Sequence, residues 1–299
     1  MKLHKYAAID IGSNGVRLLI SNVIVFKKRE TQFKKSSLVR VPIRLGEDVF
    51  TSGKISSINK NRMCDAMRAF QLLMKVYGVE KYKACATSAM REAENNQEII
   101  KFIYEKSGVK IDIIDGKTEA EIISSTDLSQ LIQSDKSYLY VDVGGGSTEF
   151  TFFSEGKLID SKSFPLGTVR ILDKKVDESE WDQAKEWIKK GSKDLPKLSL
   201  IGSGGNINKI FKMSGKAEGK PLSYIYMNSY FNFLNQMTYN ERISELDLNP
   251  DRADVIIPAT RIYLSAMKWS GANKIYVPKI GLSDGIIKNL YLEEFEPHN

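Results

Sequence analysis

The chain has 299 residues, 42% of them hydrophobic and 27% charged, with a net charge of +7 and a pI near 9.1. This length suits two domains of ordinary size, and the composition is that of a soluble globular protein. No apolar run approaches the roughly 20 residues that cross a bilayer, and the opening MKLHKYAAID contains no export signal. We therefore expect neither a membrane-embedded nor an exported protein.

The cysteines and the charge distribution indicate the cellular compartment and the kind of partner. Cys64 and Cys85 lie in apolar surroundings without metal-ligand spacing, which favours a reduced, cytoplasmic compartment over a disulfide framework. Much of the positive charge falls between Lys27 and Arg44. A nucleic-acid-binding arm would explain it, but lysines that protect a strand edge are commoner, so we expect no nucleic-acid partner. The excess charge favours an acidic substrate.

In chain order, a strand is predicted at Tyr6–Ile11, followed by the turn GSNG and a second strand at Val16–Phe26. A helix is predicted next, from Ser56 or Ser57 to Tyr77, because the apolar residues between them have helical spacing. The serine serves as N-cap, and Gly78 ends the helix. The Met and aromatic stripe of this helix is interpreted as core.

A short strand at Tyr82–Ala86 leads into a helix that Thr87 can cap, with Arg91 in its first turn. A cation at that end opposes the helix dipole. Either Arg91 has an anionic ligand, or it forms a surface salt bridge with a neighbouring glutamate. The local sequence leaves both explanations open.

Two further elements complete this α/β unit, a helix at Gln97–Lys106 and a strand at Lys110–Ile114. After the turn Asp115-Gly116, Thr118 is predicted to cap a helix that runs to Leu131, with Glu119 in its first turn. An acid there commonly complements the helix dipole. Glu119 also lies close to a predicted domain junction, where a cleft would open.

The most informative stretch is Tyr138–Phe153, YLYVDVGGGSTEFTFF, which predicts two strands joined by a tight glycine turn. The glycines let backbone N–H groups approach an anion, and the hydroxyls of Ser147 and Thr148 add donors. Asp142 and Glu149 bracket the turn with carboxylate oxygens, which Mg2+ prefers when it also contacts phosphates. The stretch predicts a metal–phosphate site, and the alternative is an ordinary hairpin whose acids face water.

The same pattern occurs near the start of the chain, where AAIDIGSNGVRLLI aligns with LYVDVGGGSTEFTFF. The corresponding aspartates, Asp10 and Asp142, are 132 residues apart. That spacing is too long for a solenoid repeat and suits duplication of a whole domain. Two similar domains, each offering a phosphate-binding hairpin to a shared cleft, would explain the match.

The rest of the chain continues the α/β pattern. KLSLIGSGGNINKIF again predicts a strand, glycines and a helix, so Ser203 and Gly204 are candidate anion contacts at a helix N-terminus. Met213–Leu222 is predicted to be a loop. The other expected elements are a strand and turn at Lys157–Thr168, helices at Ser179–Lys190 and Tyr230–Gln236, a capped turn from Asn249 into a long helix, a strand at Lys274–Val277, a turn at GLSDG (residues 281–285) and a helix at Ile286–Leu292. Trp181 and Trp187 are expected to be packing residues of the first of these helices.

Jointly these motifs resemble the exopolyphosphatase/guanosine pentaphosphate phosphohydrolase family of the actin-like, sugar-kinase and heat-shock ATPase superfamily. The resemblance covers nearly the whole chain, through IDIGSNGVRLLI, TSAMREAEN, IIDGKTEAE, VDVGGGSTE, FPLGTVR, GSGGNINKI, DRADVIIPA and GLSDGII in the family's order. It implies an α/β fold of two duplicated ribonuclease-H-like (actin-like ATPase) domains with an interdomain cleft. The expected domains are residues 1–122 plus 285–299, and residues 123–284. Closure about the hinge would bring base, metal and arginine together.

The resemblance also implies the site residues. Glu119 would position or deprotonate the attacking water, and Arg91 would contact phosphate. Asp142 and Glu149 would hold Mg2+ or Mn2+, with Asp10 orienting metal-bound water. The residues expected to bind phosphoryl oxygens are Ser13, Asn14, Gly15, Gly144, Gly145, Gly146, Ser147, Thr148, Ser203 and Gly204. Phosphoryl transfer needs this kind of positioning and charge neutralisation.

The chain departs from the family pattern in ways that leave phosphate affinity and substrate preference open. The departures are Gly15 in place of a common serine, Thr118 in place of an acid, Glu121 in place of a basic residue, and Ser283 in a GLSDG segment that lacks an arginine. Longer members carry a further helical, HD-type domain that helps hold long polyphosphate. A two-domain form should therefore prefer shorter chains.

The implied function is Mg2+-dependent hydrolysis of the terminal phosphoanhydride of inorganic polyphosphate, of guanosine pentaphosphate, or of both, in the cytoplasm and in connection with the stringent response. The expected partners are polyphosphate or guanosine penta- and tetraphosphate, with no membrane, and a homodimer is a family-level expectation. One alternative is a non-catalytic sensor, which the retained Glu119, Asp142 and Glu149 argue against. The other is a small-molecule kinase, for which no acceptor motif is found.

Overall fold

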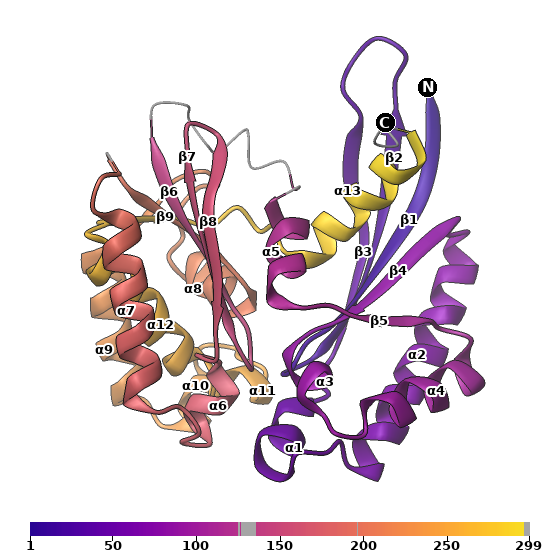
Figure 1. The fold of residues 1–299 in the computed structure, drawn as a ribbon, viewed down its shortest axis with the longest axis horizontal. Helices are drawn as coiled ribbons and strands as arrows, with labels where there is room; N and C mark the ends of the chain where they lie inside the picture. Colours follow the sequence, from indigo (N-terminus) through magenta and orange to yellow (C-terminus); the bar gives the residue numbers. More distant parts are fainter. Residues whose placement is uncertain (125, 127–135, 196, 296–299) are drawn as a thin grey trace. The chain divides into compact units, whose positions relative to one another are not determined.

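The computed structural model describes residues 1–124, 126, 136–195 and 197–295 (Figure 1). The chain divides into two compact units: unit 1 is Met1–Thr126 with Gly281–Asn299, and unit 2 is Asp127–Ile280. Each contains a mixed β-sheet with helices packed against it, which confirms the predicted α/β class. Within the described ranges, no helix has the length and apolar character needed to cross a membrane.

Unit 1 is built on a five-stranded sheet in the order β3-β2-β1-β4-β5. Its strands are β1 (Lys2–Ile11), β2 (Val16–Val25), β3 (Gln32–Val41), β4 (Lys81–Ala86) and β5 (Ile111–Ile113). The first three form an antiparallel meander, while β4 and β5 run parallel to β1. The predicted hairpin around GSNG is therefore confirmed.

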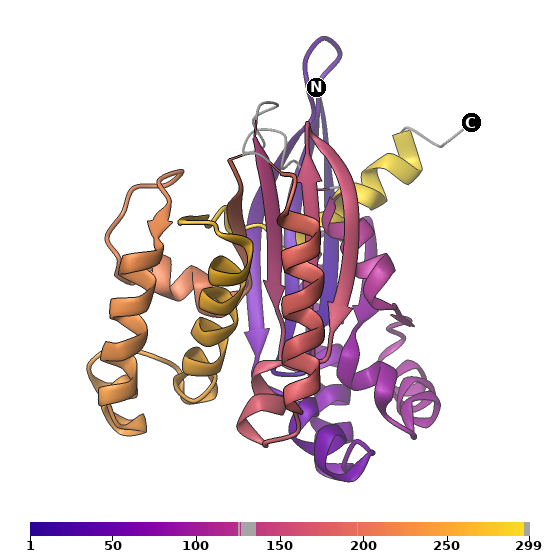
Figure 2. The ribbon, with the colours of Figure 1, turned by 60° about the vertical axis from the view of Figure 1, so that its left-hand side comes forward.

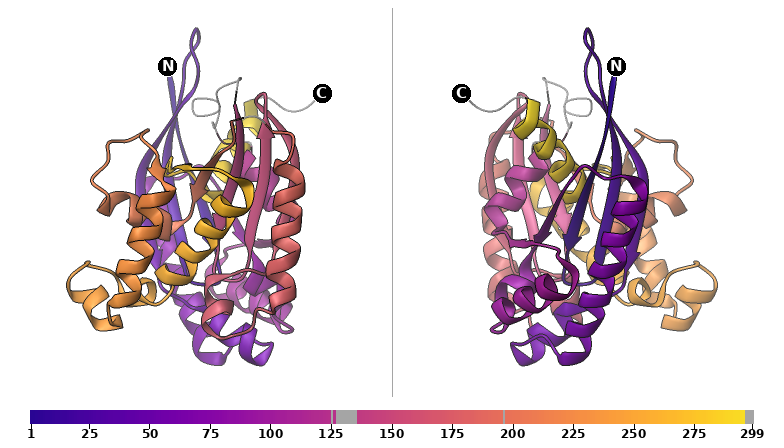
Figure 3. Two further views of the ribbon diagram at one scale, coloured as in Figure 1. Left: turned by 90° about the vertical axis from the view of Figure 1, so that its left-hand side faces the viewer. Right: turned by 90° about the vertical axis from the view of Figure 1, so that its right-hand side faces the viewer.

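Helices lie on both faces of this sheet. They are α1 (Leu45–Ser52), α2 (Ser57–Tyr77), α3 (Ser88–Glu92), α4 (Asn96–Ser107), α5 (Gly116–Ser124) and α13 (Leu282–Phe295). Met67 and Phe70 of α2 pack in one core with Ile9 of β1, and α4 lies beside α2 (Figure 3). Helix α13 contacts β1, β2, β4 and α5, and the Tyr6 hydroxyl donates a hydrogen bond to Glu294.

The predicted ends of α2 are confirmed, whereas α3 and α5 differ from prediction. Helix α3 has five residues, so Arg91 lies in its last turn, where a cation suits the helix dipole. The prediction that Arg91 opposes the dipole is thus wrong. Thr118 is not the N-cap of α5, because Thr118 N donates to Asp115 Oδ1 at 2.7 Å from inside the helix. The predicted helix end at Leu131 lies outside the described residues.

Helix α13 starts at Leu282, before the predicted Ile286, and includes a glycine that the sequence suggests is part of a turn. An ideal Cβ on Gly285 would lie 2.1 Å from Ile122 O of α5. Gly285 is therefore a packing residue, which lets α13 approach the backbone of α5 closely.

Unit 2 repeats the strand arrangement of unit 1 in a six-stranded sheet, β10-β11-β9-β6-β7-β8. The strands are β6 (Ser137–Val143), β7 (Thr148–Ser154), β8 (Lys157–Phe164), β9 (Ser199–Ser203), β10 (Leu222–Ser223) and β11 (Lys274–Tyr276). Again three antiparallel strands come first, and β9 then runs parallel to β6. The shared topology supports the domain duplication inferred from the two hairpin motifs.

The helices of unit 2 are α6 (Thr168–Leu172), α7 (Glu178–Ser192), α8 (Gly205–Met213), α9 (Tyr224–Gln236), α10 (Tyr239–Ser244), α11 (Pro250–Ala253) and α12 (Ile256–Ser270). Helix α7 lies along the sheet (Figure 2), where the Trp187 ring is 5.1 Å from the Phe152 ring. This agrees with the predicted packing role of Trp187. Helix α9 begins at Tyr224, earlier than predicted, because the Ser223 hydroxyl caps it by accepting from Tyr226 N.

Candidate functional site

The first candidate phosphate loop, loop 1 (residues 12–15), closes the β1–β2 hairpin of unit 1. Gly12 N donates to Gly15 O at 3.2 Å, which makes a tight turn. The turn is held by its surroundings, since Gly46 N donates to Ser13 O at 2.8 Å and the hydroxyls of Ser13 and Ser88 lie 3.0 Å apart. The conformation of loop 1 is thus fixed by contacts within unit 1.

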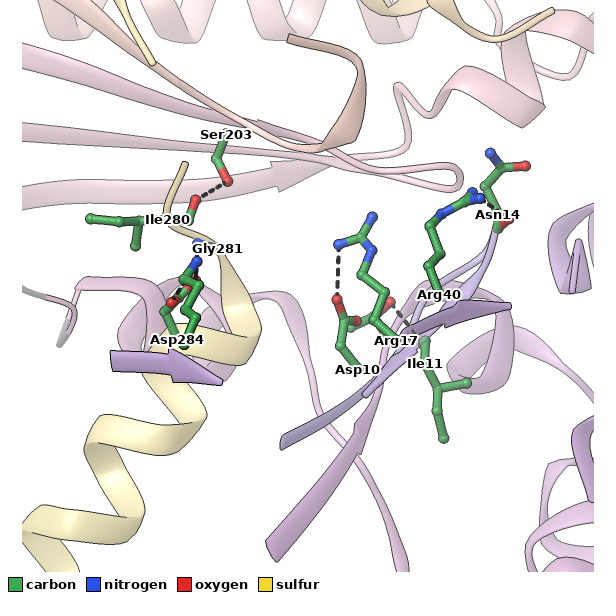
Figure 4. A network of polar contacts seen from close by, with 11 residues as sticks. Asp10, Ile11, Asn14, Arg17, Arg40, Ser203, Ile280, Gly281 and Asp284 are labelled. Carbon is green, nitrogen blue, oxygen red and sulfur yellow. Dashed lines mark hydrogen bonds and ion pairs between the residues drawn. The ribbon is translucent and has the colours of Figure 1, made fainter. Parts of the chain in front are cut away.

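Asp10 and Arg17 face each other across this hairpin, and Arg17 Nη1 lies 3.0 Å from Asp10 Oδ2 (Figure 4). Burial raises the pKa of Asp10, and the guanidinium of Arg17 opposes that rise. A carboxylate that a guanidinium already neutralises attracts a cation less strongly. The metal-associated role of Asp10 stays a prediction.

A second arginine reaches loop 1 from β3. Arg40 is the register partner of Arg17, and Arg40 Nη2 donates to Asn14 O at 3.3 Å (Figure 4). An ideal Cβ on Gly15 would lie 3.0 Å from Arg40 Nη2. Arg17 and Arg40 therefore both bring a guanidinium to loop 1, and guanidinium groups suit anion binding.

The carboxyl ends of β1, β4 and β5 meet at one edge of the unit 1 sheet. Thr87 N donates to Ile11 O at 3.1 Å, and Ile114 N donates to Ala86 O at 3.0 Å. The three strands therefore end at the same level of the sheet. Ligands of open α/β sheets bind at this edge. Loop 1, α3 and α5 all follow these strand ends.

Helices α3 and α5 bring Arg91 and Glu119 to the same edge. Arg91 Nη1 donates to Ile114 O at 2.7 Å, and Glu119 is buried, with 8% of its surface exposed. Burial raises the pKa of the Cys85 thiol, at the end of β4, to about 12, and smaller contributions come from nearby charges that include Asp10 and Glu119. The unit 1 residues predicted to act on phosphate and water therefore gather at one edge of its sheet.

Loop 2 (residues 144–147) closes the β6–β7 hairpin of unit 2 in the same way. Gly144 N donates to Ser147 O at 2.9 Å, the equivalent of the contact that closes loop 1. The strand register pairs Asp142 with Glu149, where unit 1 pairs an aspartate with Arg17. The two hairpins share their geometry and differ in charge at one equivalent position.

In the acid pair at loop 2, Glu149 is buried and Asp142 is half-buried. Glu149 is 3% exposed, and its Oε1 accepts hydrogen bonds from Ser147 Oγ at 2.6 Å and Ser163 Oγ at 2.8 Å. Residues paired across antiparallel strands have Cα atoms within about 5.5 Å, and like charges in such a pair repel. The Asp142–Glu149 pair therefore fits a bound cation, which would remove the repulsion.

The donor set indicates which cation fits. Among the described residues, no three His, Cys, Asp or Glu side chains come together in a way that could hold a metal ion. Mg2+ is commonly held by one or two carboxylates, with waters and substrate phosphates completing its shell. Zn2+ sites need three or four protein ligands. Asp142 and Glu149 thus fit Mg2+ or Mn2+ that is shared with a phosphate.

Ser203 and Gly204 lie beside Asp142 at the end of β9. The parallel register places Ser203 next to Asp142, and an ideal Cβ on Gly204 would lie 3.5 Å from Asp142 Oδ1. Tyr263 of α12 packs at this corner, where its hydroxyl donates to Ser203 O. Burial, together with the charge of Asp142, raises the pKa of Tyr263. Unit 2 therefore brings its predicted metal and phosphate residues together.

The segment after β8 packs against loop 2. Arg170 Nε donates to Gly146 O at 2.6 Å. An ideal Cβ on Gly167 would lie 2.2 Å from Gly145 O, so no side chain fits between the two segments. Arg170 contacts the carbonyl of the third residue of loop 2, just as Arg40 does at loop 1.

The hydroxyl groups predicted to bind phosphoryl oxygens have partners inside the protein. The pairs are Ser13 with Ser88, Ser147 with Glu149, Thr148 with Leu166 O, and Ser203 with Ile280 O (Figure 4). Thr148 is fully buried. In this structure these hydroxyls make internal hydrogen bonds that hold the loops in place. The guanidinium groups and the backbone N–H groups are therefore the better candidates to bind phosphate.

Reasoning from the sequence missed four side chains at these loops: Arg17, Arg40, Ser163 and Arg170. Arg17 could have been found, because hairpin register places it opposite Asp10 as it places Glu149 opposite Asp142. The other three come from segments beyond the hairpins, and no local pattern links them to the loops.

Comparison with known proteins places this geometry in a family. The profile of the Ppx/GppA phosphatase family matches residues 24–294. A bifunctional 3-dehydroquinate synthase/phosphatase of Fusobacterium nucleatum is 30% identical over 91% of this chain, which spans only 44% of that protein's length. Exopolyphosphatase 1 of Mycobacterium bovis is 22% identical, with 95% of this chain and 87% of that protein covered.

A solved structure shows the same fold. The crystal structure of an exopolyphosphatase from Cytophaga hutchinsonii superimposes with a TM-score of 0.83 at 23% identity, covering 99% of this chain and 100% of that one. The profile match extends over most of the chain. In both units it includes the site residues from Arg40 onward, together with the strands and helices that carry them. This chain belongs to the Ppx/GppA phosphatase family.

Proposed function

We propose that the protein is a divalent-metal-dependent phosphatase that removes the terminal phosphoryl group of inorganic polyphosphate. The observation that carries this proposal is the pair of buried Glu149 and half-buried Asp142 beside a phosphate-type loop. Such a pair suits a metal shared with substrate phosphates. Similarity to proteins named exopolyphosphatase supports the choice of substrate.

In the proposed reaction, unit 2 provides the metal ligands, and unit 1 provides the base and the arginine. Mg2+ held by Asp142 and Glu149 would neutralise charge on the phosphoryl oxygens. Glu119 accepts a proton from the attacking water, whose oxygen bonds to the terminal phosphorus as the bridging P–O bond breaks. Orthophosphate leaves, and the shortened polyphosphate keeps the bridging oxygen. Arg91 and the loop donors hold the charged oxygens in place.

Guanosine pentaphosphate carries the same kind of terminal anhydride, so it is the second substrate to test. The chemistry of the site does not distinguish the two, because the groups named above contact only phosphate and water. We place polyphosphate first because two similar proteins, from Mycobacterium bovis and Cytophaga hutchinsonii, are exopolyphosphatases.

The test measures orthophosphate release from polyphosphate and from guanosine pentaphosphate with Mg2+. Glu119→Gln should lower kcat by about 10^2- to 10^4-fold, the range for removing a general base. The exposed Glu105 of α4 offers a matched control, since Glu105→Gln changes the same charge away from the site. Equal rates for wild type and Glu119→Gln would contradict the assigned base. Tight substrate binding without phosphate release would indicate a sensor, and ATP-dependent phosphorylation of a small molecule a kinase.

A further inference from the structure

Arg40 brings a second positive charge to loop 1. Arg17, the other guanidinium there, lies 3.0 Å from Asp10 and neutralises that buried carboxylate. Arg40 is half-buried on β3, and its Nη2 donates to Asn14 O at 3.3 Å. The loop hydroxyl, Ser13 Oγ, lies 3.0 Å from Ser88 Oγ. The residues around loop 1 thus offer an anion a guanidinium more readily than a hydroxyl.

Gly15 explains how the guanidinium comes so close. An ideal Cβ at this position would lie 3.0 Å from Arg40 Nη2, 3.2 Å from Arg40 Cζ and 3.2 Å from Val41 O, all tighter than ordinary contact. The usual reason for a glycine in a turn, a positive φ, does not apply, because Gly15 is not among the residues with positive φ. The absence of a side chain at Gly15 therefore makes room for the Arg40 guanidinium and for the backbone of the same strand.

We propose that Arg40 is a phosphate-binding residue of loop 1 and that Gly15 is the residue that admits it. A guanidinium offers planar, paired N–H donors that match phosphoryl oxygens, and it stays charged at every working pH. The ligand class is a phosphoryl group at the end of a polyphosphate chain. That identity rests on the proposed function, whereas the assignment of an anion to Arg40 rests on the geometry of unit 1.

Binding of tripolyphosphate in the presence of EDTA tests the assignment, because it reports anion binding without the metal. Titration calorimetry should show that Arg40→Gln raises the dissociation constant about 10- to 100-fold, as expected for losing a charged hydrogen-bond donor. Arg40→Lys should recover part of the affinity, since it keeps the charge and loses the paired donors. With Mg2+ and polyphosphate, Arg40→Gln should raise KM more than it lowers kcat.

Arg62 provides the matched control. Its guanidinium also donates to a backbone carbonyl in unit 1, from Nη2 to Pro42 O at 2.7 Å, but away from loop 1. Arg62→Gln should leave the dissociation constant for tripolyphosphate unchanged. Equal affinities for wild type, Arg40→Gln and Arg62→Gln would overturn the proposal, and so would a wild-type protein that does not bind tripolyphosphate.

A double-mutant cycle tests the role of Gly15. Gly15→Ala should weaken tripolyphosphate binding on the order of 10-fold by displacing the guanidinium, which removes a charged contact. In the Arg40→Gln background, the same change should have a clearly smaller effect, because there is no guanidinium left to displace and only the contact with Val41 O remains. Additive effects would overturn the pairing of the two residues. Thermal unfolding of each variant shows that lost affinity does not come from lost folding.

The outcomes separate this inference from the proposed function. If wild type releases no orthophosphate but its affinity for tripolyphosphate depends on Arg40 and Gly15 as described, the proposed hydrolysis fails and the anion site stands. If hydrolysis is rapid in both wild type and Arg40→Gln with equal KM and equal affinity, the proposed function stands and the role of Arg40 fails.

Discussion

Loop 1 and loop 2 share a backbone design and differ in the charges placed behind it. Each turn closes with a glycine N–H that donates to the carbonyl three residues on, and each has an arginine on the carbonyl of its third residue. Behind loop 1, Asp10 faces Arg17. Behind loop 2, Asp142 faces Glu149. A basic residue at one hairpin position and an acidic residue at its equivalent make one loop suited to an anion and the other to a cation.

In each hairpin, one set of residues determines the conformation of the turn, and a different residue sets the charge beside it. Glycines and strand register build a turn that can approach a ligand closely in either unit. We expect the charge of the residue opposite the aspartate to influence which ion each loop favours. A duplicated domain can therefore acquire a different ion preference without a change of fold.

The largest expected effect comes from neutralising the acid pair of loop 2. Glu149→Gln should lower the rate of Mg2+-dependent phosphate release about 10^3-fold, because the metal would lose one of its two protein ligands. The thermal midpoint without metal should stay the same or rise slightly, because removing one of two opposed like charges is worth about 0.2–1 kcal/mol. Asp160→Asn, at an exposed position of β8, should change neither quantity. Full activity in Glu149→Gln would contradict the metal assignment.

The two loops also differ in how closely a neighbouring glycine packs against them, which gives the next largest expected effect. Gly167→Ala should destabilise the protein by about 1–3 kcal/mol, because its Cβ would lie 2.2 Å from Gly145 O. Gly12→Ala should be tolerated, since its Cβ would lie 3.4 Å from Gly15 O, at an ordinary contact distance. Urea unfolding of both variants measures the difference. Similar free energies of unfolding in the two would show that loop 2 can move away from the segment after β8.

Arg17 occupies the position equivalent to Glu149, and its removal should have the opposite effect on stability. Arg17→Gln should lower the free energy of unfolding by about 1–2 kcal/mol at neutral pH, because it leaves the buried carboxylate of Asp10 without its guanidinium. The figure is reduced from that of a fully buried pair, since the Arg17 side chain is 39% exposed.

The loss should shrink at lower pH. Burial raises the pKa of Asp10, so its carboxyl group takes up a proton on acidification and no longer needs a cation. The free energies of unfolding of wild type and Arg17→Gln should therefore converge as pH falls through that pKa. A difference that is independent of pH would show that Arg17 stabilises the hairpin by packing alone.

The smallest effect concerns the hydroxyls around Glu149. Ser163→Ala should raise the Mg2+ concentration for half-maximal activity about 5-fold, because it removes one hydrogen bond that orients the carboxylate. Ser161, two residues earlier on β8, pairs with Thr151 Oγ1 at 2.9 Å and provides the control. Equal shifts in Ser161→Ala and Ser163→Ala would point to a general effect on β8.

Much of this comparison could be predicted from the sequence. Apolar runs joined by glycine turns predict both hairpins, and the sequence shows that Asp142 and Glu149 bracket the second turn. Their cross-strand pairing follows from hairpin register, which is local. The same rule applied to Asp10 would have found Arg17. Arg40 and Arg170 reach the loops through strand pairing and chain reversal, which no local pattern reports.

The wrong predictions have local physical causes as well. Thr118 has a good capping side chain, but Asp115 accepts the hydrogen bond from its N–H, so the helix starts earlier. Gly285 suggested a turn, whereas close packing against Ile122 O requires a glycine inside α13. In both cases the sequence allowed two uses of the residue. A local hydrogen bond selected one at Thr118, and a tertiary contact selected one at Gly285.

The central claim is that loop 2 binds the cation and loop 1 the anion, and Mn2+ binding tests it most directly. Electron paramagnetic resonance of the protein with Mn2+ and tripolyphosphate should show a protein-bound Mn2+ signal in wild type. The signal should persist in Asp10→Asn, which neutralises the acid behind loop 1, and should be lost in Glu149→Gln. Retention of bound Mn2+ in Glu149→Gln, with its loss in Asp10→Asn, would contradict this division of roles.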